Sequence, residues 1–241
     1  MKLLVIIPTF NEVENIETII TSLIKSVDVD ILVVDDNSTD GTANAVEHLA
    51  VRSSHIHLLV RAEKTGLGDA YRAGFSWALA NGFDAIAQMD ADGSHRVEDL
   101  KSLIAAAAAC DVVIGSRWVE GGSIRNWPWS RYLLSRLGNL YGRMMLRIPI
   151  RDATAGFRIY SANAIRLSRM LESNSQGYVF QLENSLRITE AGVTVTEVPI
   201  TFIEREFGVS KMSGNIVKEA IAKVTLWGLK GRIFKKNILI K

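Results

Sequence analysis

Two aspartates separated by one residue, Asp90 and Asp92, follow a short apolar stretch at residues 85–89. Paired carboxylates at the end of a buried strand need compensation for their charge, and carboxylate oxygens are the ligands that Mg²⁺ and Mn²⁺ prefer. A divalent ion there would join the protein to a diphosphate and stabilise the charge of a leaving group. The alternative is that both acids cap a following helix that starts at about Ser94. Because an apolar strand precedes them, we favour the metal site.

A second group of acids, Asp35, Asp36 and Asp40, follows another apolar stretch at residues 30–34. A carboxylate at the carboxyl end of a strand often hydrogen-bonds the ribose or base of a nucleotide. The same residues also suit a tight turn in which Gly41 supplies a positive φ, and the two interpretations are compatible. The glycine-rich fingerprints of dinucleotide-binding and P-loop proteins are absent from the sequence, so neither mode of phosphate binding is supported.

Positive charge is concentrated in one part of the chain, although 28 basic and 26 acidic residues give a net charge of only +2. Residues 117–169 contain ten arginines and two acids. Arg117 and Arg131 lie near three tryptophans, and guanidinium groups beside aromatic rings suit a lipid phosphate at a membrane interface. A solvated helix surface with packing tryptophans is the alternative. With no run rich in Lys and Arg, the composition does not favour a nucleic-acid partner.

The elements that must position these residues alternate along the first half of the chain. Short apolar strands are predicted at residues 3–8, 30–34, 56–60, 85–89 and 111–115, and helices at residues 16–24, 42–50, 68–81 and 97–109. Asn11 is expected to cap the first helix. This alternation predicts an α/β fold with a Rossmann-like, mostly parallel sheet flanked by helices, whose ligands bind beyond the carboxyl ends of the strands.

The second half of the chain is less regular. Helices are predicted at residues 130–146, 162–171, 180–191 and 215–229, and a strand at residues 193–202. The loop Lys64–Gly68 precedes a helix whose amides could hold an anion, but a structural role is favoured. Arg205 and Lys211 flank a glycine-bearing loop that could close over a diphosphate, with simple solvation as the alternative. The single cysteine, Cys110, allows neither a disulfide nor a zinc site within the chain and is expected to be buried.

No stretch of the sequence reaches the roughly 18 to 20 apolar residues that span a bilayer, so we expect that the protein does not cross a membrane by itself. Residues 216–229, with the basic tail that follows, are amphipathic. Such a helix lies in the membrane interface, docks on a membrane partner or packs on the core.

These motifs, in this order, resemble the dolichyl/polyprenyl-phosphate mannosyltransferases of the family 2 glycosyltransferases. The matching segments include Ile7–Glu12 (IPTFNE), Val33–Thr42 (VVDDNSTDGT), Met89–Asp92 (MDAD), Asp152–Arg158 (DATAGFR), Gly177–Gln181 (GYVFQ) and Gly208–Lys211 (GVSK). The resemblance runs from residue 3 to about residue 213. The segments of the first half are general to family 2, whereas GYVFQ and GVSK are more specific to the polyprenyl-phosphate branch.

The resemblance implies an A-type glycosyltransferase fold and assigns residues by match to the family pattern. The nucleotide sugar would contact Pro8, Phe10, Glu12, Val34, Asp36, Asp90, Ala91, Arg205 and Lys211. The metal, Mg²⁺ or Mn²⁺, would be held by Asp90, Asp92 and Ser94. The lipid phosphate would contact Arg117, Arg131 and Ser135, and the catalytic residues would be Asp92, Arg117 and Arg131. Phe10 stands where the family usually has tyrosine, and Gly93 and Arg96 replace a hydrophobe and a proline.

The activity implied is inverting transfer of mannose from GDP-mannose to dolichyl or polyprenyl phosphate, which gives polyprenyl phosphate mannose and GDP. Alternatives are a UDP-glucose donor for the same carrier, a polysaccharide acceptor with Asp152 as the base, and a non-catalytic sugar-nucleotide-binding subunit. We expect a catalytic domain at residues 1–213, with the amphipathic helix and basic tail at 214–241 as part of it. The chain lacks the C-terminal transmembrane pair of some relatives, so we expect a cytoplasmic, membrane-peripheral enzyme that uses the membrane surface and could need an anchoring partner protein.

Overall fold

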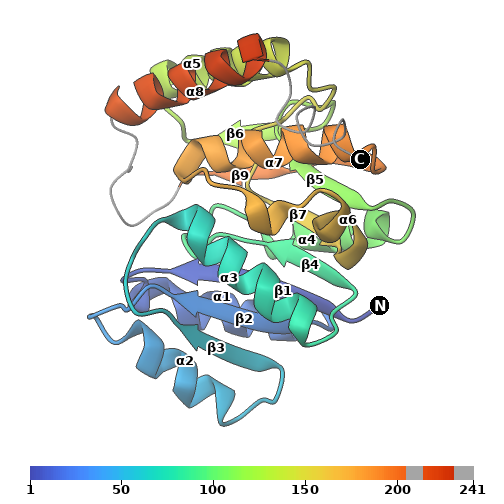
Figure 1. Ribbon diagram of the computed structural model, residues 1–241. Helices are drawn as coiled ribbons and strands as arrows, with labels where there is room; N and C mark the ends of the chain where they lie inside the picture. Colours follow the sequence, from blue (N-terminus) through green and yellow to red (C-terminus); the bar gives the residue numbers. More distant parts are fainter. Residues whose placement is uncertain (205–213, 231–241) are drawn as a thin grey trace.

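A computed structural model describes residues 1–204 and 214–230 of the chain (Figure 1). Its centre is a seven-stranded sheet in the order β3-β2-β1-β4-β7-β5-β8. The strands are β1 (Leu3–Thr9), β2 (Asp30–Asp35), β3 (Ile56–Val60), β4 (Ala85–Gln88), β5 (Val112–Ser116), β7 (Arg158–Ser161) and β8 (Val195–Pro199). β7 runs antiparallel to both of its neighbours, and the other pairs in the sheet are parallel. The predicted α/β, mostly parallel sheet is therefore confirmed.

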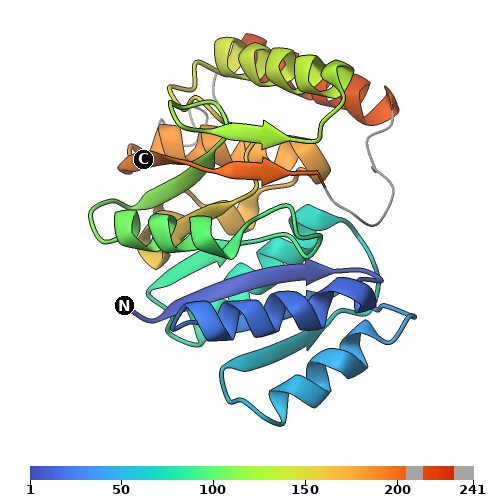
Figure 2. The same ribbon diagram turned by 180° about the vertical axis from the view of Figure 1, so that it is seen from behind.

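Helices cover both faces of this sheet, as opposite views show (Figures 1 and 2). One face carries α1 (Val13–Ser26), α2 (Thr42–Ala50) and α4 (Val97–Ala107), and the other carries α3 (Leu67–Ala80), α6 (Ala162–Leu167) and α7 (Gly177–Ala191). A 3₁₀ turn, Met170–Glu172, lies between α6 and α7. The remaining helices, α5 (Trp129–Leu146) and α8 (Gly214–Lys230), pack on each other and form an outer pair beyond α7.

Side-chain alternation along the strands explains the two-sided core. In β1, Leu4 and Ile6 pack into the cluster beneath α3 and α7, whereas Val5 and Ile7 pack into the cluster beneath α1 and α4. Successive side chains of a strand point to opposite faces, so a strand covered on both sides must be apolar throughout. The continuous apolar strand runs of the first half are a consequence of this double burial.

Two differences from prediction lie in the second half of the chain. Residues 193–202 do not form one strand: β8 joins the main sheet, while β9 (Thr201–Ile203) pairs with β6 (Ser123–Arg125) in a separate two-stranded sheet. The helix predicted at residues 162–171 ends at Leu167. The chain passes from one sheet to the other at Ile200, between the end of β8 and the start of β9. Alternation of apolar residues does not reveal such a change of partner.

The expectation that Asn11 caps the first helix is wrong. The cap position is Glu12, and Asn11 has a φ of 58° with a side chain that accepts a hydrogen bond from the Thr39 amide at 3.0 Å. The amide of Val13 instead donates to Asp40 Oδ2 at 3.0 Å. The first amide of α1 is thus satisfied by an acid from the loop after β2, and this contact ties the two loops together.

Candidate active site

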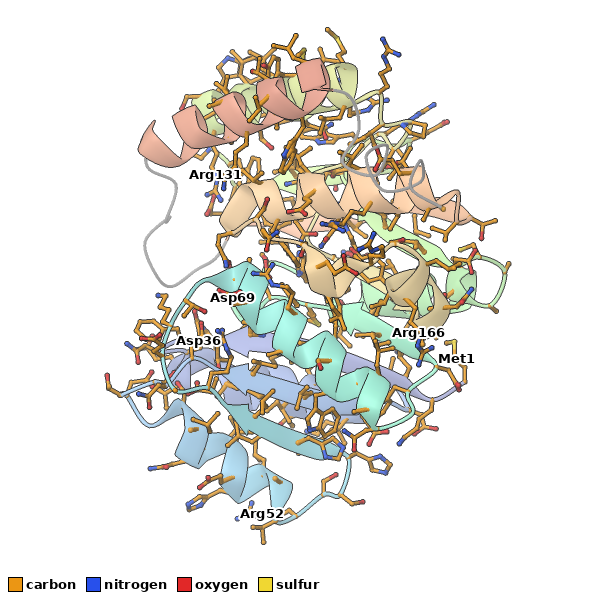
Figure 3. The ribbon with its side chains drawn as sticks, in the orientation of Figure 1. Met1, Asp36, Arg52, Asp69, Arg131 and Arg166 are labelled. Carbon is orange, nitrogen blue, oxygen red and sulfur yellow. The ribbon has the colours of Figure 1, made fainter. Side chains whose placement is uncertain are left out.

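The described residues of the predicted nucleotide and metal sites lie at or just beyond the carboxyl ends of β1, β2 and β4, as expected for a parallel sheet. These strands lie side by side in register, with Pro8 of β1 opposite Val34 of β2 and Ile6 of β1 opposite Gln88 of β4. In Figure 3, Asp36 and Arg131 lie on the same side of the molecule, opposite Met1. Arg205 and Lys211 lie outside the described residues.

The two aspartates at the carboxyl end of β2, Asp35 and Asp36, make different contacts. Asp35 is fully buried and accepts hydrogen bonds from the Thr9 hydroxyl at 2.7 Å and the Ser38 hydroxyl at 2.6 Å, so it fixes the loop. Asp36 pairs with Arg61, with Nη1 and Oδ1 2.5 Å apart. Burial raises the pKa of Asp36, and the positive charge of Arg61 opposes that rise only in part. A buried carboxyl group beside a guanidinium is suited to a neutral polar ligand such as a ribose or a base.

The other nucleotide-site candidates surround this loop. The ring of Phe10 lies under the ammonium group of Lys64, 3.6 Å from the ring centroid to Nζ. Glu12 is half-buried, and its carboxylate accepts a hydrogen bond from the side-chain amide of Asn15 at 3.3 Å. Val34 is fully buried, and its side chain packs in the core against α3. Phe10 and Lys64 thus make a cation–π contact beside the loop after β2.

Asp90 and Asp92 lie just beyond β4, and the structure excludes the alternative that they cap a helix. The helix α4 starts at Val97 with Arg96 at its cap position. Asp92 Oδ1 instead accepts from the Ser94 amide at 3.1 Å, which closes a tight turn. The backbone amide of Asp90 donates to His95 Nδ1 at 3.1 Å. The two acids therefore belong to a loop and not to a helix N-terminus.

A buried tyrosine from α3 orients this loop. The hydroxyl of Tyr71 donates to Asp90 Oδ1 at 3.2 Å. Burial raises the pKa of Tyr71 well above its ordinary value, and the negative charges of Asp90 and, more weakly, Asp92 raise it further. The hydroxyl therefore stays protonated and acts as a donor. The sequence pattern of α3 indicates only that Tyr71 is an inward-facing residue, so this role was missed.

The residues present fit a divalent cation with oxygen ligands. The hydroxyl of Ser94 is buried and has no hydrogen-bond partner among residues 1–204 and 214–230. Within the same residues, no three His, Cys, Asp or Glu side chains form a group that could hold a metal. Two aspartates and one serine leave coordination positions for a diphosphate and water, which is the way Mg²⁺ usually binds beside phosphorylated substrates.

Arg117 is held by Asp152 in a buried ion pair. Arg117 Nε and Nη2 each lie 2.8 Å from a different oxygen of Asp152, and its backbone amide donates to the same carboxylate at 3.0 Å. Burial would raise the pKa of Asp152, but the charge and hydrogen bonds of Arg117 outweigh it, so the pKa is lowered. A carboxylate held in this way is a poor general base, which removes support from the base considered for a hydroxyl acceptor.

The aromatic ring of Trp127 brings the two predicted phosphate-binding arginines together. The guanidinium carbon of Arg131 lies 4.5 Å from the ring centroid of Trp127, and that of Arg117 lies 5.8 Å from it. Arg131 also forms an ion pair with Glu204, in which both side chains are partly exposed. Ser135 is half-buried on α5, one turn after Arg131. Trp127 therefore lies between two arginines that are each paired with a carboxylate, Arg117 with Asp152 and Arg131 with Glu204.

The loop Lys64–Gly68 has the structural role that the sequence favoured. The side chain of Gln176 accepts from the amides of Gly68 at 2.9 Å and Asp69 at 3.3 Å. This cap comes from a residue 108 positions away from Gly68, so no local pattern could reveal it.

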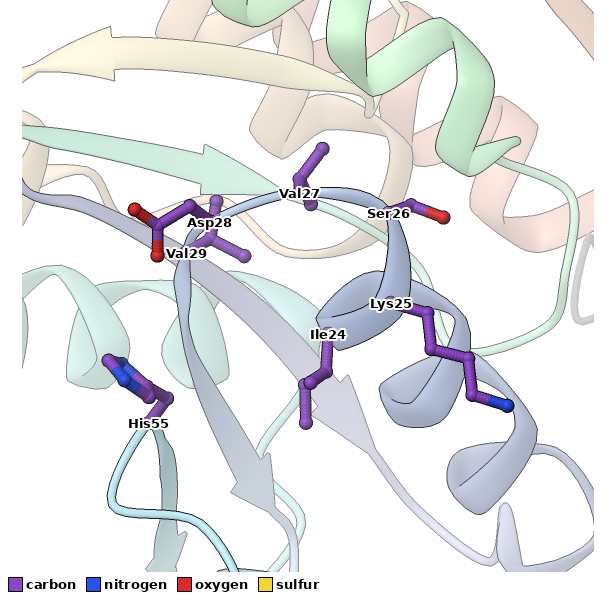
Figure 4. A pocket seen from close by; sticks show the side chains of 7 residues that line it. All are labelled: Ile24, Lys25, Ser26, Val27, Asp28, Val29 and His55. Atoms are coloured by element: carbon purple, nitrogen blue, oxygen red, sulfur yellow. The ribbon is translucent and has the colours of Figure 1, made fainter.

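A groove lies before β2 and β3, at the opposite end of the sheet from the candidate site (Figure 4). It is lined by Ile24, Lys25, Ser26, Val27, Asp28, Val29 and His55.

The fold is that of the A-type glycosyltransferases, as solved structures show. Glucosyl-3-phosphoglycerate synthase from Mycobacterium tuberculosis, in complex with Mn²⁺, UDP-glucose and phosphoglyceric acid, matches 95% of this chain and 80% of its own with a TM-score of 0.64 at 18% identity. A mannosyltransferase from Pyrobaculum calidifontis, in complex with GDP-mannose and Mn²⁺, matches 95% of this chain and 63% of its own with a TM-score of 0.59 at 18% identity. At these identities the likeness concerns the fold.

The chain belongs to glycosyl transferase family 2, whose model matches residues 4–167. It is 47% identical over 233 residues to an undecaprenyl-phosphate mannosyltransferase of Micrococcus luteus, and the match covers 96% of each chain. It is 46% identical to a polyprenol monophosphomannose synthase of Mycolicibacterium smegmatis, which covers 100% of this chain and 92% of that protein. The protein is therefore a glycosyltransferase, and the predicted family and enzyme class are confirmed.

Proposed function

We propose that this protein transfers mannose from GDP-mannose to a polyprenyl phosphate with inversion at the anomeric carbon, which releases GDP. The observation that carries the proposal is the 47% identity, over 96% of both chains, to an undecaprenyl-phosphate mannosyltransferase. The site agrees with it, because the acidic loop after β4 and the arginine pair at Trp127 offer separate places for a nucleotide diphosphate and a second phosphate.

On the donor side, Asp36, Phe10 and Glu12 hold the nucleoside, with Pro8, Val34 and Ala91 contributing backbone and wall. We assign Arg205 and Lys211 to the diphosphate by the family match. Asp90, Asp92 and Ser94 would hold Mg²⁺ or Mn²⁺, which when bound supplies positive charge for the departing diphosphate. Tyr71 keeps Asp90 in place by its hydrogen bond at 3.2 Å.

On the acceptor side, a phosphate monoester is already an anionic nucleophile at neutral pH. Arg117 and Arg131 would bind and orient this group, with Ser135 beside them, so that one phosphate oxygen faces the anomeric carbon. No proton has to be removed. This agrees with a site in which Asp152, the candidate base, is committed to Arg117 through two contacts of 2.8 Å.

The outer helix pair supports a location at a membrane surface. The side chains of Leu133, Leu137, Leu140 and Met144 are all exposed and recur every three or four residues along α5, which places them on one stripe of the helix. Arg136 on the helix is also exposed, and so are Arg147 and Arg151 after it. In the described residues, no helix has the length and apolar character to cross a bilayer. We propose that α5 and α8 rest on the cytoplasmic face of the membrane where the lipid carrier lies, as part of one domain and with or without an anchoring partner protein.

The membrane surface is tested by flotation with vesicles that contain anionic lipids. Leu137→Glu should reduce the bound fraction, because it places a charge on the apolar stripe. Leu167→Glu is the matched control, since Leu137 and Leu167 are both 54% exposed but Leu167 lies on α6. Equal binding of wild type and Leu137→Glu would contradict a role of α5.

The activity is tested by radiolabel transfer from GDP-mannose to polyprenyl phosphate in detergent, with Mg²⁺, with Mn²⁺ and with EDTA. A labelled mannosyl-phosphate lipid that forms only with metal supports donor, acceptor and metal together. Asp92→Ala should abolish turnover, and a fully active variant would remove the metal role of Asp92. Transfer from UDP-glucose alone would replace the donor while keeping the site.

A further inference from the structure

A glycine beside Asp90 leaves a small space open in the candidate site. The antiparallel register pairs Gln88 of β4 with Arg158 of β7, and its continuation sets Asp90 opposite Gly156. A β-carbon placed on Gly156 would lie 3.7 Å from His95 Cε1, 3.8 Å from Asp90 Oδ2 and 3.8 Å from Gln181 Nε2. These are ordinary contact distances, and the φ of Gly156 is negative. Neither crowding nor backbone conformation therefore requires glycine at this position.

The space is bordered by a buried amide with unused hydrogen-bonding capacity. Gln181, on α7, is only 5% exposed, and its Oε1 has no hydrogen-bond partner in the described parts of the chain. A buried amide oxygen without a partner costs free energy, so such groups usually have a partner that the protein alone does not supply. The amide nitrogen of the same side chain faces Gly156 at the distance given above.

The walls of this space are rigid. The ring of His95 stacks on Phe157 with centroids 4.7 Å apart, and its Nδ1 is used by the Asp90 amide. The helix α7 is fixed to the same loop because Phe180 stacks on Tyr71 with centroids 5.9 Å apart, and Tyr71 donates to Asp90. Gln181 and Asp90 are thus held at a set separation across Gly156.

We propose that Gln181, Gly156 and Asp90 form the subsite for the hexose of the nucleotide sugar, in which the amide of Gln181 hydrogen-bonds a sugar hydroxyl. This inference rests on the proposed function. A hydroxyl donates one hydrogen bond and accepts others, so a hexose can donate to the Asp90 carboxylate and present a second hydroxyl to the amide, which both donates and accepts. Because Gly156 has no side chain, no methyl group lies between the Asp90 carboxylate and the Gln181 amide, and a sugar hydroxyl can reach both.

A subsite for the hexose should affect the affinity for the sugar nucleotide without affecting the affinity for the nucleotide alone. Gln181→Met keeps the side-chain volume and removes the amide, and Gly156→Ala fills the space with one methyl group. Both variants should weaken GDP-mannose in the presence of Mn²⁺ while leaving the affinity for GDP unchanged. One lost hydrogen bond to a neutral group corresponds to about a two- to tenfold weaker affinity. Thr189→Val, further along α7, serves as the control and should change neither affinity.

The measurement is isothermal titration of GDP and GDP-mannose to wild type and variants, with UDP and UDP-glucose as a second pair and the melting temperature of each protein. A selective loss for the sugar nucleotide, with an unchanged or raised melting temperature for Gln181→Met, supports the subsite. Equal loss for nucleotide and sugar nucleotide, or no loss, overturns it. If the wild type binds UDP and UDP-glucose but not GDP and GDP-mannose, the proposed donor is overturned. The variants are then compared for their affinity for UDP and UDP-glucose. Wild-type binding of neither pair overturns the proposed function itself, and the subsite with it.

Discussion

The buried pair of Arg117 and Asp152 carries a prediction that can be worked out from the structure. Asp152 is fully buried, and the Arg117 side chain is 9% exposed. Arg117→Met would leave the carboxylate in place without its main cation. Breaking a buried pair from one side costs about 3–5 kcal/mol, because the remaining charge is uncompensated. Arg158 also lowers the pKa of Asp152 and stays in the variant, so we expect a loss near the lower end, about 3 kcal/mol.

The pH dependence of this loss follows from the two states of Asp152. In the wild type the folded-state pKa lies below the ordinary aspartate value of 3.8, so the pair stabilises the protein above that pH and its contribution disappears as the pH falls through the folded-state pKa. In Arg117→Met, burial instead raises the pKa of Asp152. The carboxyl group then takes up a proton as the solution is acidified, and the stability gap between the two proteins should narrow between pH 7 and pH 4.5.

The assay is urea unfolding at both pH values. A loss of about 3 kcal/mol corresponds to a midpoint shift of about 1 M, since the slope rises with size and a slope of about 3 kcal/mol per molar urea is at the upper end for small proteins. Arg131→Met is the matched control, because its pair with Glu204 is 25% and 22% exposed and such pairs contribute at most about 1 kcal/mol. A loss below about 1 kcal/mol for Arg117→Met at pH 7, or a gap that stays constant in acid, would refute the reasoning.

The ion pair of Glu204 with Arg131 and the cap of α3 by Gln176 can each be removed by one substitution. Glu204→Gln should lower the KM for polyprenyl phosphate about two- to fivefold, because it removes the anion that competes for Arg131 in a partly exposed pair; a raised KM in the transfer assay would instead mean that Glu204 orients Arg131. Gln176→Leu should reduce the free energy of unfolding by about 1 kcal/mol, the usual cost of a lost helix cap, because two amides at the start of α3 lose their acceptor. Urea unfolding measures the second effect, and an unchanged midpoint would show that water replaces the cap.

The sequence by itself determined the sheet and the positions of the acidic loops. Doubly buried strands must be apolar throughout, and polar residues must follow where the strands end, so residues 85–92 already indicate both β4 and the candidate metal loop. The family motifs added proposed roles for residues such as Ser135, which no local pattern singles out.

Tertiary structure decided which side chains these residues meet. Asp152 meets Arg117 across 35 residues, Tyr71 meets Asp90 across 19, and Gln176 caps α3 from 107 or 108 residues away. Each of these contacts depends on how helices and loops pack against the sheet, whereas periodicity along the chain records only which face of an element is apolar. For the same reason Asn11 could be read as a cap, although an acid from another loop takes that place.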